Sequence, residues 1–338
     1  MSLSGLPRPG AVQKILIWHQ GALGDLLLAG PALLALSRHY PQARITALGH
    51  PERWALLAPT LSLEAVWDSG AAAWAPLFAP DSPLPAVLKE RLARFQLALV
   101  FSPQPHPTLP ARLAQAGVAT VAWLPSWPPE GQEPVGAFLA ARLARLGVRA
   151  SKKPFRLIIG DDWEDGGPRL SGPGPFLAVA PGSGHDSKNW PLAHYYEVTR
   201  ALAWEHGLRV VWLTGPAEEG LLPYLQGLTA AQDHLLWANL PLTAVAAALA
   251  RCRLYLGGDS GLTHLAAAVG VPKVLALFGP TDPRVWAPQG EGVRVLRAPC
   301  PQAPCALARE ITCPDRVCLQ NLAPDLVLAT ASALLRHG

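Results

Sequence analysis

Short apolar runs alternate with longer amphipathic stretches along most of the chain. In the first half, the apolar runs predict strands at residues 14–18, 44–48, 65–67, 97–101 and 119–123. The run from Leu97 to Phe101 is almost wholly apolar, which is typical of a parallel strand that is buried on both faces. Stretches between the runs have helical periodicity, for example Pro134 to Leu146. Strands that alternate with helices in this way predict a right-handed parallel sheet.

The segment 160–175 interrupts this pattern, because it is rich in Gly, Pro and Asp and offers almost nothing to bury. After it the alternation restarts, with strands expected at 176–180, 209–213, 254–257 and 273–277 and helices at 192–205, 242–250, 261–269 and 324–335. We therefore expect an α/β fold of two Rossmann-like, doubly wound domains, 1–160 and 176–322, joined by a linker at 161–175. The final segment, 323–338, is expected to be a helix that crosses back to the first domain. Two such domains place a ligand cleft between the carboxyl ends of their sheets.

The composition supports two folded domains and argues against several other classes of protein. A chain of 338 residues suits two domains of roughly 150 residues each, and its 50% hydrophobic content provides a large core. The net charge of +4 comes from 28 basic and 24 acidic residues spread along the chain, so no nucleic-acid partner is expected. The longest apolar runs are far shorter than the ~20 residues of a membrane span. Residues 1–10 lack the apolar core of a signal peptide, so we expect a cytoplasmic protein.

The first candidate site follows the first predicted strand, in the segment QGALGD at 20–25. Its two glycines, Gly21 and Gly24, allow a sharp turn and a close approach of the backbone to a ligand. Asp25 begins the following helix, where it is either a helix cap or a general base at the mouth of the cleft. The spacing differs from the GxGxxG fingerprint, and no acidic residue ends the second strand. A nicotinamide cofactor is therefore not expected.

The second candidate site follows the first strand of the second half, in the segment APGSGHDSKNWP at 180–191. Small residues, the Ser183 hydroxyl and one lysine precede a helix that begins with Pro, which suits a phosphate. Lys188 is a compact cation that matches a pyrophosphate, although a solvated loop lysine is the alternative. The order of residues is not that of a Walker A loop.

The third candidate site lies where another predicted strand ends and a helix of small residues begins, in the segment LGGDSGLTHLAAA at 256–268. The amides of the first helical turn, together with hydroxyls such as that of Ser260, form an anion site. His264 lies one turn further along and is either part of this site or a structural histidine. The segment FGPTDP at 278–283, after the next strand, adds a loop to the same cleft.

In this order, the motifs GxxGD, PGxxxxxKxWP, GDSGxxHLAA and FGPTDP resemble glycosyltransferase family 9, which contains the lipopolysaccharide heptosyltransferases. The resemblance runs from Lys14 to the C-terminal helix and is looser between Pro51 and Asp165. It implies a GT-B fold with two domains facing across a cleft, and inversion at the anomeric carbon without a bound metal or cofactor. The implied donor is a nucleotide sugar, ADP-heptose, and the implied acceptor is a hydroxyl of a lipopolysaccharide-core-like or other cell-envelope glycan or glycolipid. Peripheral contact with the inner membrane stays open.

The same resemblance assigns roles to individual residues. Asp25 matches the general base, Lys188 the lysine that binds pyrophosphate, and Glu218, in the segment GPAE at 215–218, a glutamate that binds ribose. The implied donor-binding residues are Gly24, Ser183, Lys188, Glu218, Asp259, Ser260, Gly261 and His264. One departure concerns the first loop, where His19 and Gln20 stand at positions near which the family often has an Arg. The sequence assigns no acceptor contact, linkage or oligomeric state.

Three alternatives remain open at this point. The first is a sugar-nucleotide epimerase on the same GT-B architecture, which would need no acceptor. The second is a serine hydrolase with Ser260 as nucleophile and His264 as base, although a His four residues along one helix is a poor triad partner. The third is a two-lobed binding protein, which would need export.

Cysteines are concentrated near the end of the chain. Cys300, Cys305, Cys313 and Cys318 form the pattern C-x4-C-x7-C-x4-C, whereas Cys252 follows a predicted helix and is expected in the core. Free thiols, disulfides and a zinc site are all compatible with this spacing.

Overall fold

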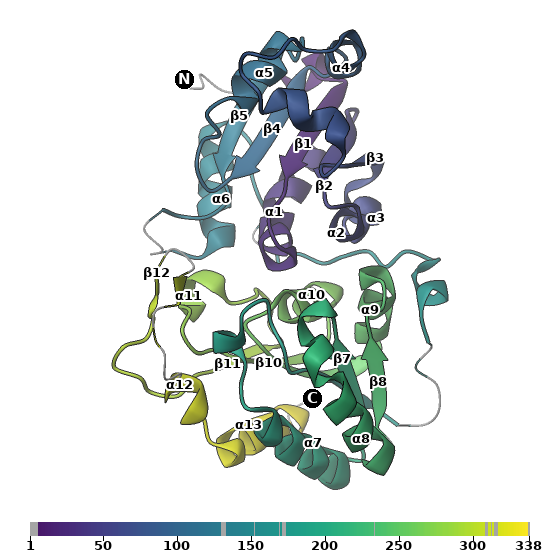
Figure 1. The fold of residues 1–338 in the computed structure, drawn as a ribbon, viewed down its shortest axis with the longest axis vertical. Coiled ribbons are helices and arrows are strands. Elements are labelled where there is room, and N and C mark those ends of the chain that lie inside the picture. The colour runs from purple at the N-terminus through teal and green to yellow at the C-terminus, as the bar shows by residue number, and fades with distance from the viewer. Residues whose placement is uncertain are drawn as a thin grey trace. The chain divides into compact units, whose positions relative to one another are not determined.

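The chain consists of two compact units, Met1–Ile158 and Ile159–Gly338, each with its own sheet (Figure 1). The computed structural model describes residues 6–129, 133–151, 153–168, 170, 174–232, 234–307, 310–311, 313 and 317–336. Strand pairing within the sheet of each unit is parallel throughout. The α/β class expected from the sequence is confirmed.

The sheet of the first unit has the order β3-β2-β1-β4-β5. Its strands are β1 (Lys14–His19), β2 (Arg44–Gly49), β3 (Leu63–Asp68), β4 (Leu97–Ser102) and β5 (Thr120–Pro125). Its helices are η1 (Pro9–Ala11), α1 (Leu23–His39), α2 (Pro51–Ala55), α3 (Ala58–Leu61), η2 (Ala72–Leu77), α4 (Ala86–Leu92), α5 (Leu109–Gln115) and α6 (Val135–Arg145). The strand order reverses between β1 and β4, and ligands of such sheets bind beside the carboxyl ends of the strands at that point. The loop from β1 to α1, which carries Asp25, lies at this position.

The core of this unit explains why the central strands were predictable. Ile15, Leu16 and Ile17 of β1 are fully buried, because β1 lies between β2 and β4 and helices cover both faces. In Figure 1, α1 and α6 lie against each other along one side of the sheet, and their residues are in contact.

The sheet of the second unit has the order β11-β10-β9-β6-β7-β8, so its reversal lies between β6 and β9. Its strands are β6 (Phe176–Ala180), β7 (Arg209–Thr214), β8 (Leu235–Ala238), β9 (Cys252–Gly258), β10 (Lys273–Leu277) and β11 (Val293–Leu296). A separate antiparallel hairpin pairs β12 (Ala306–Leu307) with β13 (Glu310–Ile311). The helices are η3 (Trp163–Gly166), η4 (Asp186–Lys188), α7 (Leu192–His206), η5 (Pro216–Leu221), α8 (Leu222–Gln232), α9 (Leu242–Leu249), α10 (Gly261–Val269), α11 (Pro283–Trp286), α12 (Val317–Gln320) and α13 (Pro324–Arg336).

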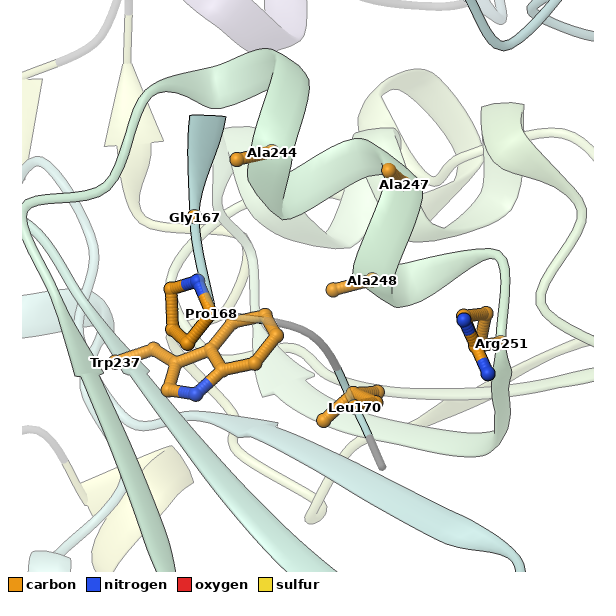
Figure 2. A pocket seen from close by; sticks show the side chains of 8 residues that line it. All are labelled: Gly167, Pro168, Leu170, Trp237, Ala244, Ala247, Ala248 and Arg251. Atoms are coloured by element: carbon orange, nitrogen blue, oxygen red, sulfur yellow. The ribbon is translucent and has the colours of Figure 1, made fainter. Parts of the chain in front are cut away.

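Part of the segment expected to be a linker packs on the second unit. Trp163 of η3 is buried, and η3 lies against α9. Figure 2 shows the adjoining chain beside a small, largely apolar pocket lined by Gly167, Pro168, Leu170, Trp237, Ala244, Ala247, Ala248 and Arg251. The Gly- and Pro-rich composition therefore marks chain without regular strands rather than chain without contacts.

The last helix, α13, packs on α7 of the second unit. Its apolar side chains Val327, Ala331 and Leu335 are buried in the core of that unit, together with Leu202 of α7. We expected this helix to cross back to the first domain. Its buried apolar side chains instead pack in the core of the second unit.

Candidate functional site

The predicted donor-binding segments follow strands of the second unit and meet through specific contacts. Lys188, at the end of η4, lies after β6, and Asp259 follows β9. Lys188 Nζ donates a hydrogen bond to Asp259 Oδ2 over 2.8 Å. The Asp259 side chain is only 8% exposed and that of Lys188 is 27% exposed, so the carboxylate is buried whereas the lysine remains partly open to solvent. The structure thus joins two predicted site residues that are far apart in sequence.

Thr281, in the FGPTDP segment after β10, holds the same carboxylate. Its Oγ1 donates to Asp259 Oδ2 over 2.8 Å and is itself buried. Sequence reasoning placed this segment in the cleft but did not single out Thr281, because the contact depends on how the loops after β9 and β10 meet. The sequence feature that could have identified Thr281 is a hydroxyl directly after Gly-Pro at the end of a buried strand.

The start of α10 lies next to this ion pair. Ser260 is the extended N-cap residue, and Gly261 opens the helix, whose first amide N–H groups have no acceptors earlier in the helix. Thr263 Oγ1 donates to the Gly258 carbonyl, which fixes the end of β9 to the first turn. A Cβ at Gly258 would lie 3.1 Å from the Lys188 carbonyl oxygen, so the two loops are in close contact. This arrangement provides a cation and a positive helix end side by side.

Ser183 and His264 are both largely buried in this unit. Ser183 Oγ lies 2.7 Å from Asn189 Oδ1 and 2.8 Å from the His185 carbonyl oxygen, so it stabilises the loop that carries Lys188. Asn189 was not predicted as a site residue. His264 lies on α10, one turn after its start, and is 7% exposed.

Glu218 lies on η5, after β7, and supports the loop that follows β6. Its Oε2 accepts a hydrogen bond from the Gly215 amide over 2.7 Å. A Cβ at Gly182 would lie 2.1 Å from Glu218 Oε1, so only glycine fits at position 182 while this carboxyl keeps its place. Burial raises the pKa of Glu218 above its ordinary value.

In the first unit, Asp25 occupies the first turn of α1. Its Oδ2 accepts a hydrogen bond from the Ala22 amide over 3.0 Å, and its side chain is buried. Asp25 is therefore a helix cap, as one of the two sequence hypotheses expected, and this bond also fixes its carboxylate in the loop. Gly24 lies beside it in the same turn.

The geometry disfavours the serine hydrolase hypothesis. Ser260 Oγ lies 3.3 Å from Thr263 Oγ1, and the neighbouring carboxylate, Asp259, is already held by Lys188 and Thr281. A triad needs that carboxylate to orient the imidazole. The pocket in Figure 2 is not this site either, since no predicted site residue lines it.

The cysteines are unpaired thiols within the described part of the chain. Cys252 is buried as expected, and burial raises the pKa of its thiol to about 12. The Cys305 amide donates to the Pro280 carbonyl over 2.9 Å, so the cysteine-rich tail contacts the FGPTDP segment. Among the described residues, no group of three or more His, Cys, Asp or Glu side chains is arranged to hold a metal ion.

Comparison with known proteins finds similarity that covers most of the second unit. Residues 152–316 match the family model of glycosyltransferase family 9 (heptosyltransferase). The resemblance expected from the motifs is confirmed. Lipopolysaccharide heptosyltransferase 1 of Pseudomonas aeruginosa is 35% identical over 133 residues, and lipopolysaccharide heptosyltransferase 2 of Escherichia coli K12 is 33% identical over 134 residues. These alignments span 36% and 38% of the relatives' own lengths and 39% and 38% of this chain.

Solved structures match nearly the whole chain. The glycosyl transferase family 9 protein from Veillonella parvula superposes with a TM-score of 0.78 at 18% identity, covering 96% of this chain and 98% of that one. The E. coli heptosyltransferase WaaC with ADP gives 0.71 at 18% identity, covering 95% and 100%. At this identity the likeness shows the fold, and it confirms the expected GT-B class.

In the part of the chain that the structure describes, no helix is long and apolar enough to cross a bilayer.

Proposed function

We propose that the protein is an inverting, metal-independent heptosyltransferase that moves heptose from ADP-heptose to a hydroxyl of a lipopolysaccharide-core-like acceptor. The observation that carries the proposal is the contact between Lys188, Asp259 and Thr281 beside the start of α10. This contact lies in the part of the chain that matches the heptosyltransferase family model. E. coli WaaC, which has the same fold, was solved with ADP and with ADP-2-deoxy-2-fluoro heptose.

The chemistry of donor cleavage fits these residues. Departure of a nucleoside diphosphate places negative charge on the pyrophosphate, which preorganised positive groups stabilise. Lys188 uses one of its three N–H groups on Asp259, which leaves two for phosphate oxygens. The first-turn amides of α10 add a positive helix end. We assign Glu218 to the ribose, whose hydroxyls would donate to its carboxyl oxygens, and Ser260, Gly261 and His264 to the donor phosphates.

The acceptor hydroxyl needs a base, because inversion proceeds by its direct attack on the anomeric carbon. We assign this role to Asp25, whose carboxylate is held at the end of β1 by the Ala22 amide. A single carboxylate suffices for an inverting displacement, since the leaving diphosphate needs no protonation at neutral pH. The acceptor in this proposal is a glycolipid, so the enzyme would act at the inner face of the cytoplasmic membrane.

The proposal is tested by incubating the protein with ADP-heptose and a heptose-free lipopolysaccharide core in the presence of EDTA. ADP release that depends on the acceptor is expected, and NMR of the product should show the inverted anomeric configuration. Reaction of the donor without acceptor would instead support an epimerase on the same fold. ADP release that requires a divalent metal would contradict the metal-independent mechanism.

A further inference from the structure

The short helix α2 holds the loop that carries Asp25 through two side-chain hydrogen bonds. Arg53 Nη1 donates a hydrogen bond to the Gly21 carbonyl over 2.9 Å, across 32 positions of sequence. The next residue, Trp54, donates from Nε1 to the His19 carbonyl over 3.4 Å. Both contacts are made to the chain between the end of β1 and the start of α1.

The local sequence explains why α2 reaches this loop. In the sheet, Gly49 at the end of β2 is in register with His19 at the end of β1. A Cβ at Gly49 would lie 2.3 Å from the His19 carbonyl oxygen and 2.2 Å from Trp54 Nε1, so glycine is required for this close passage. Pro51 then opens α2, and Trp54 is fully buried, which anchors the helix and places Arg53 beside the loop.

Gly21 connects Arg53 to the catalytic carboxylate. The Gly21 amide donates to His19 Nδ1 over 3.2 Å, and its carbonyl accepts from Arg53. A Cβ at Gly21 would lie 2.9 Å from Asp25 Cβ and 3.1 Å from Asp25 Oδ2, so Gly21 packs directly against that side chain. Any shift of the Gly21 peptide is therefore transmitted to Asp25 and to the Ala22 amide that binds it.

We propose that Arg53 is a positioning residue for Asp25, which it acts on through the Gly21 carbonyl. The proposal rests on the assignment of Asp25 as the base in the proposed transfer reaction. Arg53 is only partly buried and contributes a fixed, planar donor that a flexible lysine or a glutamine cannot reproduce in full. The Arg53 side chain contacts the loop that carries Asp25, and its proposed role requires no contact with the donor.

Kinetics of three variants test this role. In Arg53→Gln, kcat should fall roughly 10- to 100-fold, because a displacement of about 1 Å at a reacting group costs up to that much. The KM for acceptor and the affinity for ADP should remain within about twofold of wild type, and Arg53→Lys should recover part of the rate. Arg53→Ala should regain activity when millimolar guanidinium ion is added, which a loss of folding would not allow. The matched control is Arg44→Gln, since Arg44 is 70% exposed and pairs with Glu64 in the same unit.

A measurement without substrate separates this inference from the proposed function. Hydrogen–deuterium exchange of the amides in 20–26 should be faster in Arg53→Gln than in wild type and unchanged in Arg44→Gln. If exchange is faster in Arg53→Gln but wild type has no transferase activity, the proposed function is refuted, while Arg53 is still shown to hold this loop. Unchanged exchange, or a higher acceptor KM with an unchanged kcat, would overturn the positioning role.

Discussion

Replacing Lys188 by Met removes the cation of the proposed donor site and keeps the length of its side chain. In the structure the Lys188 ammonium lies 2.8 Å from Asp259 Oδ2, and Thr281 donates to the same oxygen. Two effects are expected, one on folding and one on binding of ADP. They have different sizes, which makes them separable.

The effect on folding is expected to be small. The Lys188 side chain is 27% exposed, so solvent screens the ion pair, and its contribution to the free energy of unfolding is about 1 kcal/mol or less. Thr281 remains to satisfy one oxygen of Asp259. The double variant Lys188→Met with Asp259→Asn should be no less stable than Lys188→Met alone, since it removes the buried charge that was left without its cation.

The effect on binding is expected to be larger. A hydrogen bond to a charged partner contributes about 1.5–3 kcal/mol, so the loss of one contact to the pyrophosphate should raise the Kd of ADP roughly 10- to 150-fold. By linkage, ADP at 100 times the wild-type Kd stabilises wild type by about 2.7 kcal/mol. With a 30-fold weaker Kd, the same ADP concentration stabilises the variant by only about 0.9 kcal/mol.

Isothermal titration with ADP and thermal unfolding with and without ADP measure both effects. The matched control is Lys273→Met, because Lys273 is partly buried in the same unit but starts β10 at the opposite end of the sheet. An ADP affinity of Lys188→Met within twofold of wild type would refute the assignment of this lysine to the pyrophosphate. It would leave the ion pair as a structural contact between two loops.

Three further outcomes are expected. Asp25→Asn should keep the helix cap and change the free energy of unfolding by at most about 1 kcal/mol. It should nevertheless lower kcat about a hundredfold or more, because the general base is lost. Near-normal turnover would show that Asp25 is a cap alone. Burial raises the pKa of Glu218, so its carboxyl stabilises the fold most when protonated, and this contribution is lost as pH rises through the folded-state pKa. Glu218→Gln should therefore match the wild-type Tm at low pH and equal or exceed it at pH 8, while ADP affinity falls; a lower Tm at pH 8 would contradict this sign. Iodoacetamide should leave Cys252 unmodified in the native protein but label Cys300 and Cys305, which are more exposed. Mass spectrometry after digestion measures the labelling, and protection of Cys300 and Cys305 would indicate a disulfide or a bound metal.

The sequence was most informative where strands are buried on both faces. The ranges expected at 176–180 and 273–277 agree with β6 and β10, and the helix expected at 261–269 agrees with α10. By contrast, β8 and β11 were not predicted. Both are edge strands with partly exposed residues, so their apolar pattern is weak. Hydrophobic patterning reports burial, and strands at the edge of a sheet are buried on fewer sides.

The candidate site shows a similar division. Lys188, Asp259 and the start of α10 were predictable because each belongs to a local motif directly after a strand. Thr281 and Arg53 were not, since each acts on a residue more than twenty positions away, Asp259 for the first and Gly21 for the second. Such contacts depend on strand order and on how loops of neighbouring strands meet.

Gly182 and Glu218 explain why several weak motifs together carried more information than any one of them. Gly182 is one of the small residues for which the segment 180–191 was considered a phosphate site. In the structure, the space that a side chain at position 182 would fill is occupied by the Glu218 carboxyl, which follows a different strand. A residue in one motif is thus required by a residue in another, and the same holds for Lys188 and Asp259. Motifs that constrain one another in this way are expected to occur together and in a fixed order, so their joint presence along the chain is stronger evidence for the site than their separate frequencies suggest.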